Sequence, residues 1–286
     1  MRALPSTLSL PVLVLALAGC FEEEREVKLV PGGAGTMRLE VQVREDLSRA
    51  ALQEGEEKLR RDAAAGLASW EGVAAWSDVD VATLESRIVI RGTAWFEDVE
   101  ALRREGQPFL LLQRDGQQVT ATLYAGKVDP QREPVYARFL ELSPEQVAAE
   151  LEQERRQLAQ LLAGFRLAIA LELPAVPERA EGFQIDGSTA HFTLAGDEMR
   201  RELEAHLAHA EEVAQRARAG ELTREEALKL LGERERALSH LQPRTVTWTD
   251  PPADDPARAE FQRRLSEVRA AWETSEWHDL MRAEGS

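Results

Sequence analysis

One group of residues in the sequence has the types and spacing that suit metal chemistry. Glu202, His206, His209 and Glu212 follow one another at intervals of four, three and three residues. On a helix these intervals place the side chains near one stripe, and imidazole and carboxylate groups are ligands of zinc. His206 and His209 are therefore candidate metal ligands of a zinc-dependent hydrolase. The alternative is a solvated helix face, because the segment lacks an HExxH motif and sequence identifies no third ligand.

Other catalytic signatures are missing from the sequence. It contains no G-x-S-x-G motif, no Walker A motif and no cysteine placed as a nucleophile. His191 lies on the polar side of a predicted strand, where an exposed position explains it as well as a catalytic base would. With 51 acidic residues, any two carboxylates could be neighbours, so no acid-base pair can be assigned. We therefore expect a non-enzymatic protein without a cofactor.

Aromatic residues gather in the first half of the chain. Trp70, Trp76, Trp95 and Phe96 flank Gly72 and Gly92. They can line a groove for a lipid or a sugar, or they can be ordinary core residues, because small sheets bury such side chains.

Cys20 is a further chemically distinctive residue, and it follows a predicted secretory signal. Residues 8–18 (LSLPVLVLALA) form an apolar run after Arg2. As a helix this run rises ~17 Å, well short of a hydrocarbon core about 30 Å thick. Leu17-Ala18-Gly19-Cys20 resembles the lipobox of bacterial lipoproteins, in which the cysteine receives the lipid. The alternative is an ordinary signal peptide whose cleavage site adjoins a cysteine.

The cysteine count and the charge agree with export and lipidation. Cys20 is the only cysteine of the chain, so no disulfide can form within it, and lipidation would consume its thiol. The formal net charge is −16. An acidic field repels nucleic acid and anionic headgroups at long range, so we expect no nucleic-acid partner.

The pattern of predicted elements indicates an α+β fold with an antiparallel sheet of about five to seven strands packed with helices, plus a helical C-terminal region. Hairpins are expected over 27–44, 109–124 and 183–194, and further strands over 86–96 and 165–173. Helices are expected over 46–66, 98–104 and 143–163, and from about 197, 223 and 256 onward. The segment Thr245–Trp248 is predicted as an edge strand.

These elements predict four parts of the chain. Residues 1–19 are expected as the signal peptide and 20–26 as a lipidated tether, because a strand-like alternation begins at Val27. Six residues span at most about 20 Å, so the folded part should stay close to the bilayer. Residues 27–195 are predicted as the α+β domain. Residues 196–286 are predicted as a helical region that packs on this domain or extends it.

Three segments together resemble the LppM-type lipoproteins of bacterial envelopes. They are the lipobox, VKLVPGGAGTMRLEVQV and FRLAIALELPAVPERAEGFQIDGSTAHFTLAGDE. The sequence departs from that family in having a long helical tail where the family has a C-terminal transmembrane helix. The resemblance implies binding of a lipid or glycolipid and supplies no catalytic residues.

The sequence therefore predicts a palmitoylated, membrane-anchored lipoprotein of the bacterial cell envelope. Its expected place is the outer membrane, facing the periplasm. Its expected partner is a lipid, a glycan or a protein at the membrane surface. The rival interpretation is the zinc-dependent envelope hydrolase that uses His206 and His209.

Overall fold

The computed structural model describes residues 21–43, 55–84, 87–104, 106–123, 133–252 and 254–284. These residues form two compact units, each assembled from separate stretches of the chain. The strand unit contains the described residues of 21–123, 166–193 and 243–284. The helical unit contains 133–165 and 194–242. The chain therefore alternates between the two units, whereas the sequence analysis divided it once, at 195/196.

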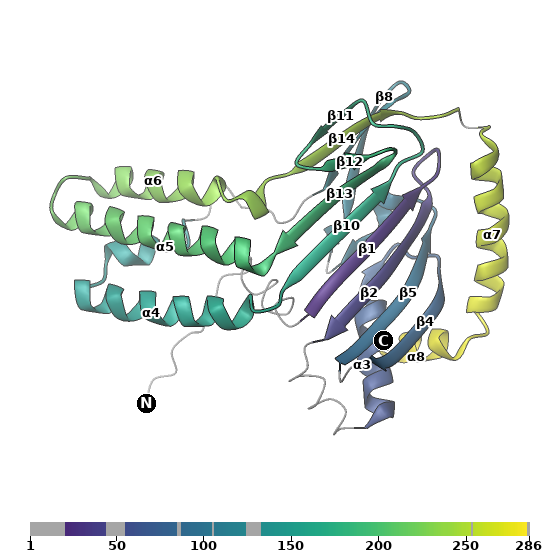
Figure 1. The fold of residues 1–286 in the computed structure, drawn as a ribbon, viewed down its shortest axis with the longest axis horizontal. Helices are drawn as coiled ribbons and strands as arrows, with labels where there is room; N and C mark the ends of the chain where they lie inside the picture. The colour runs from purple at the N-terminus through teal and green to yellow at the C-terminus, as the bar shows by residue number, and fades with distance from the viewer. Residues whose placement is uncertain are drawn as a thin grey trace. The chain divides into compact units, whose positions relative to one another are not determined.

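The strand unit is built on a seven-stranded sheet with the order β12-β13-β10-β1-β2-β5-β4 (Figure 1). Its strands are β1 (Phe21–Leu29), β2 (Gly35–Val43), β4 (Ala75–Leu84), β5 (Arg87–Phe96), β10 (Arg166–Glu172), β12 (Gln184–Asp186) and β13 (Thr189–Ala195). β1 is antiparallel to β2, as β2 is to β5 and β5 to β4. β1 pairs with β10 in parallel. The α+β fold with a mostly antiparallel sheet is confirmed.

Two smaller sheets complete the strands of this unit. One has the order β11-β14-β9-β8 and the other β3-β6-β7. Their strands are β3 (Trp70–Glu71), β6 (Arg103–Arg104), β7 (Gln107–Pro108), β8 (Leu110–Asp115), β9 (Gln118–Leu123), β11 (Arg179–Glu181) and β14 (Arg244–Thr249). β14, predicted as an edge strand, lies between β11 and β9 instead. Trp248 is 1% exposed, so β14 pairs with two strands and also contributes a side chain to the core.

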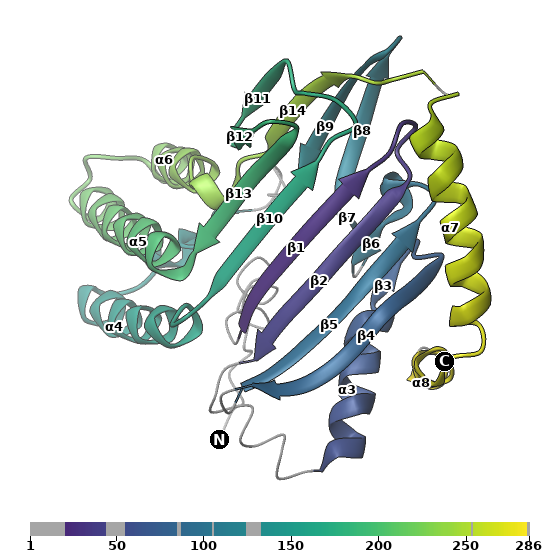
Figure 2. The same cartoon turned by 45° about the vertical axis from the view of Figure 1, so that its right-hand side comes forward.

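Three α-helices and one short 3-10 helix belong to the strand unit. They are α3 (Glu56–Ala68), η1 (Val99–Ala101), α7 (Pro256–Trp272) and α8 (Glu276–Glu284). α3 contacts α8, and α7 runs beside β4, as Figure 2 shows. Phe261 of α7 stacks on Trp95 of β5, with ring centroids 5.6 Å apart. This stack joins a small core that also contains Val30 and Leu265.

One glycine of the sheet is required by close packing. Gly92 of β5 faces the ring of Trp76 on β4, and a Cβ at this position would lie 3.1 Å from a ring carbon. Since such a contact is tighter than ordinary van der Waals packing, a larger residue would displace Trp76.

The helical unit consists of three α-helices that lie side by side in Figures 1 and 2. They are α4 (Pro144–Leu161), α5 (Gly196–Arg218) and α6 (Arg224–Arg236), with two 3-10 helices, η2 (Ala137–Leu140) and η3 (Ser239–Leu241). Capping boxes fix the helix starts predicted near 143 and 223: Ser143 caps α4 with Gln146, and Thr223 caps α6 with Glu226. Each side chain satisfies a backbone N–H group that the helix leaves unpaired.

Candidate functional site

The start of β1 is the feature that most changes the expectation from sequence. β1 begins at Phe21, so residues 21–26 are strand rather than tether. At this end of the sheet β2 stops at Val43, β5 starts at Arg87, β4 stops at Leu84 and β10 starts at Arg166. We call it the Phe21 end. Cys20 and the signal peptide lie outside the described residues, so lipidation stays a prediction.

The acidic run Glu22–Glu24 can form a strand because arginines from other strands neutralise it. Glu22 and Glu24 lie on one face of β1. There Glu22 pairs with Arg87 of β5 at 3.2 Å, and Glu24 pairs with Arg166 of β10. Both pairs are partly exposed, and such pairs contribute only about 0–1 kcal/mol each. Their main effect is to remove repulsion among three consecutive carboxylates.

Glu23 points to the opposite, packed face and is 3% exposed. Arg25 donates from Nε to Glu23 Oε1 at 2.6 Å, and Arg104 Nη1 lies 3.3 Å from Glu23 Oε2. Both guanidinium groups lie over the ring of Trp70, at 5.0 and 5.7 Å from its centroid, and that of Arg25 also lies 5.5 Å from Phe109. We call Glu23, Arg25, Arg104, Trp70 and Phe109 the Glu23 cluster.

The Glu23 cluster keeps its carboxylate ionised. Burial alone would raise the pKa of Glu23, but the charges and hydrogen bonds of Arg25 and Arg104 hold this pKa below its usual value. Two cations around one carboxylate leave the cluster with an excess positive charge. The rings of Trp70 and Phe109 offer their faces to that charge, which cation–π attraction favours.

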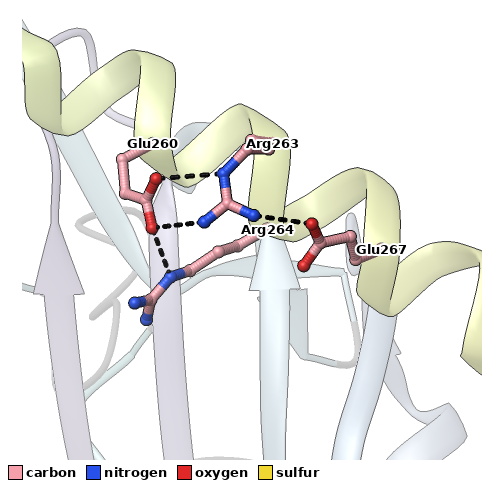
Figure 3. A network of polar contacts seen from close by, with 4 residues as sticks. All are labelled: Glu260, Arg263, Arg264 and Glu267. Carbon is pink, nitrogen blue, oxygen red and sulfur yellow. Dashed lines mark hydrogen bonds and ion pairs between the residues drawn. The ribbon is translucent and has the colours of Figure 1, made fainter.

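A second charge network lies on α7 (Figure 3), and its side chains are exposed to solvent. Arg263 donates to Glu260 at 2.8 and 3.1 Å and to Glu267 at 2.6 Å, and Arg264 donates to Glu260 at 2.7 Å. These hydrogen bonds lower the pKa of Glu260. The residues are three or four positions apart on one helix, so the network supports the helix.

The candidate metal ligands do not come together as a zinc site. His206 is 2% exposed and packs against Tyr136, with ring centroids 5.1 Å apart. Neither ring nitrogen of His206 has a hydrogen-bond partner in the described part of the chain. His209 is only partly buried. Across the described ranges, no three His, Cys, Asp or Glu side chains are grouped to hold a metal ion. The zinc hypothesis gains no support and is not carried further.

The acidic members of the predicted stripe lie elsewhere. Glu202 accepts from the Ser239 backbone N–H at 3.2 Å, and its Oε2 lies 3.4 Å from Nδ1 of His240. Burial would raise the pKa of Glu202, but these contacts lower it below the usual value. Glu202 therefore joins α5 to η3. Glu212 is exposed on α5.

Burial sets the ionisation of His206. It lowers the pKa of this imidazole from 6.5 to about 4, assisted by the nearby charges of His209, Arg234 and His240. Burial also raises the pKa of Tyr136 beyond its ordinary value. The two rings therefore form a neutral contact at neutral pH.

Most of the aromatic side chains singled out in the sequence are buried in the core. Trp70, Trp76 and Phe96 are 5%, 5% and 0% exposed, so these aromatics are core residues. Trp95 is partly buried and stacks on α7. His191 is exposed on β13. Sequence reasoning missed the Glu23 cluster, because Arg104, Trp70 and Phe109 lie far along the chain from the acidic run.

No helix in the described ranges is long and apolar enough to cross a membrane. No known protein family matches the chain, and no match is found among characterised proteins. Among solved structures, the folded domain of LppM from Mycobacterium tuberculosis, determined by NMR, is similar. The match covers 62% of this chain and 82% of that one, at 11% identity and a TM-score of 0.28. This likeness is weak.

Proposed function

We propose that this chain is a lipid-anchored, non-enzymatic protein of the bacterial cell envelope that binds a lipid, glycan or protein partner at the membrane surface. The lipobox sequence that ends at Cys20 supports the anchor. The observation that carries the proposal is the start of β1 at Phe21. The residue that directly follows Cys20, the proposed site of lipidation, thus belongs to a strand of the sheet.

This short connection limits where a partner can be bound. Consecutive Cα atoms are ~3.8 Å apart, so Phe21 stays beside the anchor. At ~3.3 Å per residue, a strand as long as β1 spans about 30 Å. The strand unit therefore works within a few tens of ångströms of the bilayer, which favours partners in or beside the membrane.

The contacts of the histidines favour binding over catalysis. His206 packs on Tyr136, and His240 contacts Glu202. In both cases the imidazole serves packing or a local hydrogen bond. A broad screen of the anchored protein for hydrolysis of envelope polymers and esters tests this part. Turnover that survives purification would contradict a purely binding role.

Metabolic labelling tests the anchor. Cells that express the full chain are grown with an alkyne analogue of palmitate, beside cells that express Cys20→Ala. We expect the wild-type chain to carry the label in the membrane fraction, and the variant to lose both the label and most of its membrane association. Separation of inner and outer membranes then tests the expected outer-membrane location. A labelled Cys20→Ala chain would contradict lipidation at this residue.

A further inference from the structure

The Phe21 end of the sheet carries an exposed apolar side chain, that of Leu84. Phe21 pairs with Val43, Gln42 with Val89, and Leu84 with Arg87. The end of β4 therefore lies at the same level along the strands as the start of β1. Three strand spacings of ~4.8 Å separate them, so Leu84 lies about 15 Å to the side of Phe21.

Leu84 is unusual among the large apolar residues that the structure describes. It is 54% exposed, whereas most side chains of this kind are in the core. Val176 is 67% exposed but follows the opposite end of β10, past Glu172, which pairs with Lys28. Leu84 is thus exposed at the level of Phe21 along the strands, and Val176 is exposed at the far end.

Ion pairs neutralise the acidic run at the Phe21 end. Glu22 pairs with Arg87 and Glu24 pairs with Arg166 at partly exposed positions. Glu23 pairs with Arg25 and Arg104 on the packed face. In a chain with a formal net charge of −16, this pairing reduces the repulsion between these carboxylates and anionic headgroups.

We propose that the Phe21 end is a membrane-docking surface, on which Leu84 enters the lipid interface beside the anchored Cys20. The bilayer is the occupant because Cys20, the proposed lipidated residue, directly precedes Phe21 in the chain. This inference rests on the proposed lipid anchor and adds an orientation to it. The lipid chains hold the protein on the membrane, while Leu84 turns this end of the sheet toward it. Because Leu84 lies at the end of β4, its apolar side chain can enter the interface without carrying a polar side chain into it.

The cysteine count makes a direct test possible. Cys20 is the only cysteine of the chain, and its lipid would block reaction with a maleimide. Leu84→Cys and the matched control Val176→Cys are prepared as full-length, lipidated proteins and labelled with an environment-sensitive dye. They are then placed in phosphatidylethanolamine–phosphatidylglycerol vesicles that carry a lipid-bound quencher. We expect quenching at position 84 to exceed that at 176 roughly threefold or more.

The outcomes separate this inference from the anchor itself. Equal quenching at the two positions, or stronger quenching at 176, would overturn the docking surface while the protein remains lipidated. A blue-shifted dye at 84 without quenching would overturn it too, since it would indicate a protein contact. The wild-type chain is the control for the anchor. If it reacts with the maleimide, Cys20 carries a free thiol, and the proposed function fails instead.

Discussion

The two units of the molecule treat a buried ionisable side chain in opposite ways. In the strand unit, Glu23 is buried as a charged group, with two arginines around it. In the helical unit, His206 is buried as a neutral group, with neither nitrogen hydrogen-bonded among the described residues. A buried charge persists only with partners, whereas a buried imidazole can lose its proton instead. The fold is therefore sensitive to loss of a partner at Glu23 and to loss of neutrality at His206.

The largest effect is expected from Glu23→Gln, which leaves Arg25 and Arg104 without their shared carboxylate. Removing one partner of a buried ion pair costs about 3–5 kcal/mol, and we expect the lower part of this range because Arg104 is partly exposed. Because the pKa of Glu23 is lowered in the fold, its contribution is complete at neutral pH and is lost as the pH falls below 4.5. Urea unfolding at pH 7 measures the change.

Glu24→Gln is the matched control, since this neighbouring carboxylate pairs with Arg166 at a half-exposed position. We expect it to cost less than about 1 kcal/mol. Equal losses for the two variants would show that burial of Glu23 does not set its contribution.

The second prediction concerns pH and the helical unit. His206 has a pKa of about 4 in the fold against 6.5 when unperturbed, so between these values the unfolded chain binds a proton that the folded chain does not. As the pH decreases through this range, the free energy of unfolding should decrease by ~1.4 kcal/mol per pH unit. From pH 7 to pH 5 the decrease should be about 2 kcal/mol. In His206→Leu this share of the fall should disappear, as circular dichroism of urea-unfolded samples at both pH values would show.

His209→Leu is the control for that experiment, because it removes a histidine from the same helix at a partly buried position. It should keep most of the wild-type fall between pH 7 and pH 5, because burial, the largest cause of the lowered pKa of His206, remains. An unchanged fall in His206→Leu would mean that this residue is already charged in the fold.

A smaller loss is expected from Asp250→Ala in the strand unit. Asp250 accepts from the backbone N–H of Gly32 at 3.0 Å, from Trp248 Nε1 at 3.2 Å and from Arg114 at 3.0 Å. Its removal leaves two neutral donors and one charged donor without this acceptor, which we expect to cost about 2 kcal/mol in thermal or urea unfolding. Asp186→Ala, at an exposed position on β12, should change stability by less than about 0.5 kcal/mol.

The smallest effects are expected at the caps of the helical unit. Ser143→Ala and Thr223→Ala each remove a side-chain acceptor from a capping box and should cost ~1 kcal/mol. Thr223→Ser keeps the hydroxyl and should stay near the wild-type value. The two losses should add, because the caps belong to different helices. No loss in either alanine variant would show that packing alone fixes these helix starts.

Local signals allowed much of the fold to be predicted. The helix starts near 143 and 223 and the hairpin over 183–194 depend on neighbouring residues, and all three are where the sequence predicted them. The succession of such local signals along the chain predicts the α+β class. β4, at Ala75–Leu84, was missed. Its regular pairing with β5 shifts between Ser77 and Asp80, and Asp78 adopts a positive φ, so the alternation that marks a strand is interrupted.

Long-range pairing is what the sequence concealed. The parallel pairing of β1 with β10 joins residues more than a hundred positions apart, for example Glu22 and Arg166. Without that pairing the run Glu22–Glu24 reads as a solvated tether. For the same reason the stripe that contains His206 suggested a metal, since Tyr136, its actual neighbour, is far away in sequence.

The central place of β1 in its sheet has a mechanical consequence. β1 lies between β2 and β10, with nine residues in register on one side and seven on the other. A pull on residue 20 along the strand direction loads the hydrogen bonds of both neighbours at once, in shear, because these bonds run across the strand. A chain held at the end of an edge strand would instead peel open one bond at a time. Tension between the envelope and whatever this protein holds would therefore be borne by a strand that is paired along both of its edges.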